Sequence, residues 1–144
     1  MPTDNRTLVP WLDPEAIRFM LRECDTWAVV GLSGDPSRTA YRIARFLSDH
    51  GKRIVPVHPE ANTVLGEPGY ASLAEIPFPV DCVDVFRRSS AAGVFADQAV
   101  DIGAKGVWFQ LGVLDQAAFD RATTAGLRMV MDTCPVIEWP RYAR

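Results

Sequence analysis

The sequence predicts an α/β fold in which a five-stranded parallel sheet carries helices on both faces. Short apolar runs alternate along the chain with segments whose apolar residues recur at helical spacing. The runs have the length of buried strands, and they are followed by glycine, proline or polar turn residues. The predicted strands cover residues 27–31, 53–57, 81–86, 106–110 and 127–131.

Composition and charge favour one globular domain over residues 1–144, with residues 1–12 as a polar N-terminal arm. Hydrophobic residues form 48% of the chain and charged residues 23%, which argues against the disordered and fibrous classes. The formal net charge of −3 argues against broad binding to nucleic acid or to a membrane surface. A small anionic ligand remains compatible with this charge, because local basic residues can face one crevice.

The lack of a recognisable signal peptide or membrane helix, together with the cysteine usage, predicts a soluble cytoplasmic protein. The N-terminus lacks the apolar core of a signal peptide, and no apolar run approaches the roughly 18–20 residues of a membrane helix. The three cysteines, Cys24, Cys82 and Cys134, show no paired spacing. Neither a disulfide framework nor a metal site is therefore predicted, and a reducing compartment is favoured.

The first elements in order are an extra helix, a strand and a second helix. Asp13 is suited to cap the extra helix and Pro14 to begin it, and residues 17–24 continue it with one apolar face. The helix after the first strand has its apolar face over residues 40–47, and Gly51 is expected to end it. Three residues are alternative caps for its start: Asp35, Ser37 and Thr39.

The second and third strands each contain a residue that restricts their position in the sheet. Pro56 lacks a backbone donor, so it must lie where that hydrogen bond is not needed. Residues 60–69 are predicted as a loop, and residues 72–75 as the start of a short helix. Asp81 and Asp84 alternate with apolar residues, which indicates a less-buried face or an edge position for the third strand.

The last elements are two helices, two strands and an apolar tail. The helix after the third strand is expected to run to about Gly103, with four residues at helical spacing: Val94, Phe95, Gln98 and Ile102. Asp115 or a neighbour is expected to cap the next helix. Ile137 and Trp139 make the tail apolar enough to pack back on the domain.

The candidate binding site follows from the predicted sheet, because ligands bind outside the carboxyl ends of parallel strands. The first strand, its loop and the following helix start can hold phosphate through backbone amides. The residues that leave the strand ends are Gly31 to Ser33, Val57 to Pro59, Phe86 to Arg88, Gln110 to Gly112, and Asp132 to Cys134.

Two common nucleotide-binding patterns are missing from this predicted edge. The first loop has only Gly31 and Gly34, so it lacks G-x-G-x-x-G, and it also lacks the lysine of a Walker loop. ATP hydrolysis by that route is therefore disfavoured. The second strand ends at His58 and Pro59 with no acid at its tip, and Glu60 lies beyond, which disfavours NAD.

Arginines can replace those patterns in holding a phosphate-bearing nucleotide. Arg38 in the first loop and Arg87 after the third strand can approach a diphosphate. Arg88 is less favoured, because adjacent residues at a strand end diverge. The alternative for all three is a solvated charge on the surface.

Four motifs occur in the order known from one protein family: Gly31-Leu32-Ser33-x-x-Pro36-x-Arg38, Pro56-Val57-His58-Pro59, Val83-Asp84-Val85-Phe86-Arg87-Arg88 and Val107-Trp108-Phe109-Gln110-Leu111-Gly112-Val113. Over roughly residues 13–140 the chain resembles the small stand-alone CoA-binding proteins of bacteria. These are similar to the CoA-binding domain of the succinyl-CoA synthetase α-subunit. The resemblance implies a Rossmann-like fold that binds coenzyme A at the carboxyl edge of the sheet.

The resemblance also implies which residues contact each part of coenzyme A. The implied contacts are Gly31, Leu32 and Ser33 at the diphosphate, Val57, His58 and Pro59 beside the adenosine, and Phe86 and Arg87 along the ligand. Arg38 in the first loop and Gln110 at the end of the fourth strand are further candidate contacts from the predicted sheet edge. The family often has asparagine where this chain has His58, although a histidine can still donate a hydrogen bond.

No catalytic constellation is predicted. Synthetases that share this domain need a phosphohistidine and an ATP-grasp partner in other domains. His50 is interpreted as a helix-end cation, and His58 as a ligand contact or packing residue rather than a general base. Cys134 is interpreted as a structural thiol, because no flanking base is visible beyond Arg128 and Arg141.

The leading hypothesis is thus a non-catalytic module that binds CoA or an acyl-CoA and acts as a carrier, sensor or partner subunit. One alternative is an NAD(P)-binding oxidoreductase-like domain. The other is an interaction protein whose fold has lost its ligand. The acyl group, a protein partner and a homo-oligomer are left open by the sequence.

Overall fold

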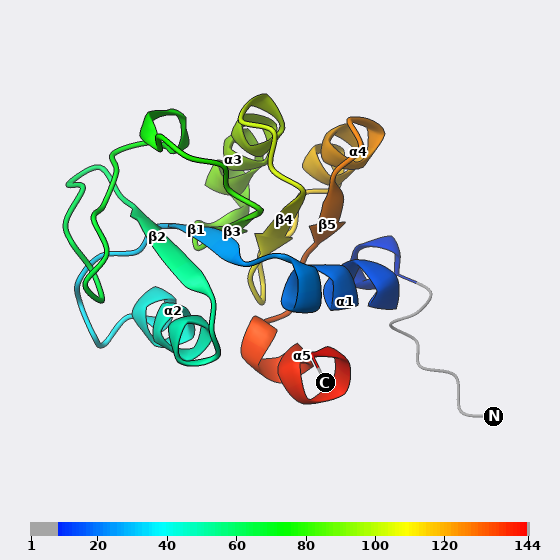
Figure 1. The fold of residues 1–144 in the computed structure, drawn as a ribbon. Helices are drawn as coiled ribbons and strands as arrows, with labels where there is room; N and C mark the ends of the chain where they lie inside the picture. Colours follow the sequence, from blue (N-terminus) through cyan, green and yellow to red (C-terminus); the bar gives the residue numbers. More distant parts are fainter. Residues whose placement is uncertain (1–8, 144) are drawn as a thin grey trace.

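The computed structural model describes residues 9–143, which form one parallel five-stranded sheet in the order β2-β1-β3-β4-β5 (Figure 1). The strands are β1 (Thr26–Val30), β2 (Arg53–Val57), β3 (Cys82–Val85), β4 (Gly106–Phe109) and β5 (Arg128–Val130). The chain runs from β1 to β2 on one side and then from β3 to β5 on the other. The predicted Rossmann-like α/β fold is confirmed, and the strand order reverses between β1 and β3.

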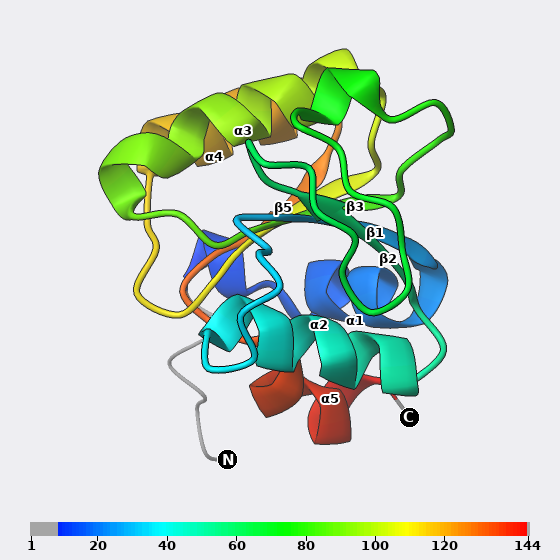
Figure 2. The same ribbon diagram turned by 90° about the vertical axis from the view of Figure 1, so that its left-hand side faces the viewer.

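Helices cover both faces of the sheet (Figure 2). One face carries α1 (Pro14–Glu23), α2 (Thr39–Asp49) and α5 (Pro135–Tyr142), and the other carries α3 (Ser89–Asp101) and α4 (Gln116–Thr124). Two short 3-10 helices, η2 (Pro10–Leu12) and η3 (Leu73–Glu75), precede α1 and β3. Within residues 9–143, every helix is too short or too polar to span a bilayer.

The core consists of two apolar layers, because successive residues of a strand point to opposite faces. In β1, Trp27 packs into the layer below α1 and α2, whereas Ala28 packs into the layer below α3 and α4. The Trp27 and Trp108 rings lie 5.9 Å apart. Both buried indoles donate hydrogen bonds to backbone carbonyls, of Cys24 at 2.7 Å and of Thr133 at 2.9 Å. The two largest core residues are therefore buried without an unsatisfied donor.

The structure corrects the apolar face predicted for α3. The predicted residue Val94 is 52% exposed. The buried face is instead made of small residues: Ala92, Gly93, Ala96 and Ala99. A Cβ atom at Gly93 would lie 2.6 Å from Asp115 Oδ2 at the start of α4. Small residues thus face the core because α3 packs closely against its neighbours. The prediction searched for large apolar residues at helical spacing, so it missed a buried face made of alanine and glycine.

The structure also corrects the position predicted for the third strand. The strand β3 is the central strand of the sheet, not an edge. Asp84 is fully buried and lies in register between Val29 of β1 and Trp108 of β4. The alternation of acidic and apolar residues in this segment therefore does not indicate an exposed face at Asp84. The proline-containing strand β2 is an edge strand, as the missing donor of Pro56 requires.

Both ends of the described chain pack on the domain. The predicted arm at residues 1–12 falls mostly outside the described residues, but its last residues form η2. There Trp11 lies edge-on to Phe119, with ring centroids 6.1 Å apart, and its carbonyl accepts a hydrogen bond from the Met131 amide. The apolar tail forms α5, which packs against α1 and α2, in agreement with the prediction.

Candidate functional site

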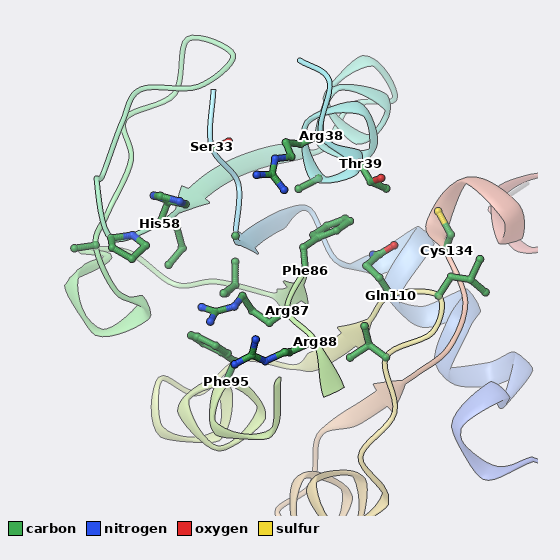
Figure 3. A pocket seen from close by; sticks show the side chains of 18 of the residues that line it. Ser33, Arg38, Thr39, His58, Phe86, Arg87, Arg88, Phe95, Gln110 and Cys134 are labelled. Atoms are coloured by element: carbon green, nitrogen blue, oxygen red, sulfur yellow. The ribbon is translucent and has the colours of Figure 1, made fainter. Parts of the chain in front are cut away.

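A cleft of about 800 Å³ opens at the carboxyl edge of the sheet, where the loops after the strands meet (Figure 3). The structure brings nearly all predicted site residues into its wall: Gly31, Ser33, Arg38, Val57, His58, Pro59, Phe86, Arg87 and Gln110. Four residues of the predicted strand ends do not line the cleft: Leu32, Gly112, Asp132 and Thr133. The Leu32 side chain is 1% exposed and belongs to the apolar layer below α2. The cleft spans the reversal of strand order between β1 and β3, where this class of sheet binds ligands.

Gly31 shapes the centre of the cleft. Its φ angle is 93°, and its amide donates to the Val57 carbonyl at 2.8 Å. A Cβ atom at this position would lie 2.7 Å from the Phe86 carbonyl oxygen. Only glycine combines this backbone conformation with such a close approach of β1 to the end of β3.

The loop after Gly31 leads to a helix start that no side chain caps. Arg38 occupies the N-cap position of α2 and makes no capping hydrogen bond. The predicted alternatives Asp35, Ser37 and Thr39 are therefore wrong as caps. Asp35 instead accepts hydrogen bonds from the amide and hydroxyl of Ser37, which lower the pKa of its exposed carboxyl. The first turn of α2 lines the cleft, so its amides and helix dipole favour an anion there.

Three arginines add positive charge and hydrogen-bond donors around this helix start. Arg38, Arg87 and Arg88 all line the cleft, although Arg88 was expected to turn away. The Arg87 guanidinium lies 5.7 Å from the Phe95 ring centre, and Arg38 Nε lies 3.8 Å from an Asp35 carboxylate oxygen. Figure 3 shows Arg38 and Arg87 approaching the same space from α2 and from the end of β3.

A buried pair lies under the floor of the cleft. Gln110 lines the cleft, and its Nε2 donates a hydrogen bond to Asp84 Oδ1. The second oxygen, Asp84 Oδ2, has no hydrogen-bond partner among the described residues. Burial raises the pKa of Asp84 to about 8, and the hydrogen bond from Gln110 opposes this only in part. Asp84 is therefore largely a neutral acid at pH 7, and it orients the Gln110 carboxamide.

Neither His58 nor Cys134 has the surroundings of an activated catalytic group. His58 Nδ1 accepts a hydrogen bond from the Glu60 amide at 3.2 Å, so one ring nitrogen is used within its own loop. Burial raises the pKa of the Cys134 thiol, despite hydrogen bonds from two amides in the first turn of α5. A protonated thiol is a poor nucleophile.

Some residues of the cleft wall were not found from the sequence: Thr39, Ala40, Ala71, Phe95, Val113 and Ile137. Phe95 lies one turn or more inside α3, and Ile137 comes from α5. The wall residues from α5 could not be placed from the sequence, because the docking position of the tail depends on contacts with α1 and α2. Thr39 was detectable, since it follows directly on the predicted phosphate-binding loop.

The chain is similar to a protein family, to a curated bacterial protein and to solved structures. Residues 25–140 match the family described as CoA binding domain. The chain is 35% identical over 118 residues to "Uncharacterized protein YneT" of Bacillus subtilis (strain 168), which covers 82% of this chain and 87% of that protein. A hypothetical protein from Pyrococcus horikoshii OT3 has a TM-score of 0.86 at 34% identity, over 94% of this chain and 96% of that one.

A synthetase shares the fold at lower identity. The dinucleotide forming acetyl-coenzyme A synthetase 1 of Ca. Korarchaeum cryptofilum has a TM-score of 0.68 at 23% identity. The similarity covers 78% of this chain and 27% of the synthetase chain. At this identity the comparison shows a shared fold for one part of a much larger protein.

Proposed function

Because the chain belongs to the CoA binding domain family, we propose that it binds coenzyme A or an acyl-CoA across the carboxyl edge of its sheet, without catalysis of its own. Membership in this family confirms the resemblance inferred from the four sequence motifs. We place the protein in the cytoplasm, where its free cysteines Cys24, Cys82 and Cys134 stay reduced.

One observation carries the proposal: the cleft joins the Gly31 turn, the uncapped start of α2 and the arginines in one wall. A diphosphate near Gly31 would face backbone amides, with Arg38 and Arg87 within reach of its charge. The adenosine would lie beside His58 at the end of β2. Exposed Glu60, which bonds to Asn62 at 3.1 Å, does not line the cleft and offers no ribose contact of the NAD type.

The absence of catalysis is proposed from the state of the reactive groups. Cys134 is held as a neutral thiol by burial. His58 uses Nδ1 for its own loop, and His50 stacks on Phe46 at the far end of α2, with ring centroids 4.0 Å apart. A binding module acting as a carrier, sensor or partner subunit fits these surroundings better than an enzyme.

Calorimetric titration with CoA, dephospho-CoA, NAD and NADP tests the proposal. We expect CoA to bind with a measurable heat and NAD to bind more weakly. Failure of CoA to bind up to millimolar concentration would overturn the proposal. Binding of NAD alone would support the oxidoreductase-like alternative.

Arg87→Ala is expected to weaken CoA binding by about tenfold to a hundredfold, as loss of a charge-assisted phosphate contact would do. Arg42→Ala is the matched control, because Arg42 is an exposed arginine of α2 outside the cleft, with Nη2 3.5 Å from the Thr39 hydroxyl. Titration of both variants with CoA measures the difference. Equal losses would show that Arg87 acts only through the overall charge of the protein.

A further inference from the structure

The side chains that line the cleft change from charged to uncharged along the edge of the sheet. The ends of β2, β1 and β3 and the start of α2 supply its charged and imidazole groups: His58, Arg38, Arg87 and Arg88. The end of β4, the loop after it and the start of α5 supply only uncharged side chains: Gln110, Leu111, Val113, Cys134 and Ile137. Figure 3 shows the arginines on one side of Phe86, with Gln110 and Cys134 on the other.

The uncharged end leaves apolar side chains in water. Of the five large hydrophobic residues that are exposed within residues 9–143, Leu111 and Ile137 line this end of the cleft, and Leu114 and Val136 lie close to them in the sequence. Leu111 is 64% exposed and Ile137 is 54% exposed, and both line the cleft. A cluster of exposed apolar side chains next to a polar cleft is typical of a binding surface.

Hydrogen bonds hold the loop that carries Leu111 in place. Asp132 adopts a φ angle of 61°, and its Oδ1 accepts from the Gly112 amide at 2.7 Å. The Leu114 amide donates to the Ser89 hydroxyl at 3.0 Å. The apolar end is thus formed before a ligand arrives, which lowers the entropic cost of binding.

The length of the edge fits a ligand with an anionic part and a distant apolar part. Three strand spacings of about 4.8 Å separate β2 from β4, so the strand ends that line the cleft span roughly 14 Å, and Ile137 at the start of α5 extends the wall beyond β4. A nucleotide diphosphate held near Arg38 and Arg87 would leave the thiol end of its pantetheine arm to run past Gln110. That end then reaches Leu111 and Ile137.

We propose that this uncharged end binds the acyl group of an acyl-CoA, and that the group is short, aliphatic and uncharged. The inference rests on the proposed function and names its ligand class. A carboxylate at the end of the acyl group would lose water there, and it would meet no cationic side chain among the residues that line this end of the cleft. The free thiol of CoA would leave Leu111 and Ile137 exposed.

Titration with CoA, butyryl-CoA and succinyl-CoA tests the inference, because the two acyl groups have four carbons and differ in a terminal methyl or carboxylate. Each methylene that becomes buried strengthens binding about fourfold. We expect butyryl-CoA to bind about tenfold tighter than CoA, and succinyl-CoA at least tenfold more weakly than butyryl-CoA. Equal affinities for all three would overturn the inference and leave the proposed function standing. Failure of all three to bind would overturn the proposed function itself.

Substitutions at Ile137 locate the acyl group. Ile137→Asn is expected to reduce the ratio of butyryl-CoA to CoA affinity toward one, and Ile137→Lys to invert the preference in favour of succinyl-CoA. Val94→Asn is the control, because Val94 is equally exposed but lies outside the cleft. Sedimentation of the Ile137→Lys variant provides a second measurement: a change in oligomeric state with an unchanged affinity ratio would assign the apolar end to a second copy of the chain and overturn the inference.

Discussion

Gly31→Ala is expected to destabilise the protein by about 3 kcal/mol or more, because the substitution combines an unfavourable backbone angle with a steric clash. The φ angle of 93° lies outside the region that alanine adopts readily. The new Cβ atom would also lie 2.7 Å from the Phe86 carbonyl oxygen, a backbone atom that moves only if β1 and β3 separate. Urea unfolding of the variant and the wild type measures the change.

Gly34→Ala is the matched control for this result. Gly34 lies three residues further along the same loop, and a Cβ atom there would have no neighbour within 4 Å. Its free energy of unfolding should stay within about 0.5 kcal/mol of the wild type. Equal destabilisation by the two alanine variants would show that loop flexibility, and not the close approach of Gly31 to Phe86, is what the glycines provide.

Asp84→Asn is expected to change the dependence of stability on pH. The folded pKa of Asp84 is about 8, well above its ordinary value of 3.8. Between pH 4 and pH 8, Asp84 is ionised in the unfolded chain but keeps its proton in the folded protein. Each unit by which the pH rises in this range therefore lowers the free energy of unfolding by about 1.4 kcal/mol. This contribution to stability is fully present below pH 4 and is lost as the pH rises to 8.

Asparagine can accept the Gln110 hydrogen bond and cannot ionise. Relative to the wild type, the Asp84→Asn variant should therefore gain stability between pH 5 and pH 8, by on the order of 3 kcal/mol. The buried thiols that interact with Asp84 do not interfere, because burial raises the pKa of both Cys82 and Cys134 and keeps them protonated over this interval. Urea unfolding at pH 5, 6.5 and 8 measures the difference.

Asp81→Asn is the control for Asp84→Asn, because Asp81 directly precedes β3 but its pKa is shifted in the opposite direction. Partial burial acts to raise the pKa of Asp81, but amide hydrogen bonds from Thr26 and Asp25 and the charge of Lys105 lower it overall. Asp81 is thus ionised in both states between pH 5 and 8, and its stabilising effect is lost only as the pH falls toward its folded pKa. The Asp81→Asn difference should stay constant from pH 5 to 8. A constant difference for Asp84→Asn as well would show that folded Asp84 is ionised.

The sequence located most of the cleft because the fold class determines which loops meet. The predicted strand ends placed Gly31, His58, Phe86 and Gln110 at one edge, and parallel pairing brings those ends together whatever the details of packing. The Leu32 side chain lies in the core and not in the cleft wall, because alternation along the strand stops at Gly31 and the turn directs the next side chain inward. Sequence spacing does not encode that change of direction.

What the sequence determined by itself was therefore the class of fold, the order of its elements and the edge of the sheet where the cleft lies, since these depend on local periodicity and on turn residues. The tertiary structure decided the rest. It placed β3 at the centre of the sheet and so buried Asp84 under Gln110. It also docked α5 against α1 and α2, which brought Ile137 into the cleft wall. Both features depend on contacts between residues far apart in the chain, and the free energy of such contacts is not visible in any local pattern.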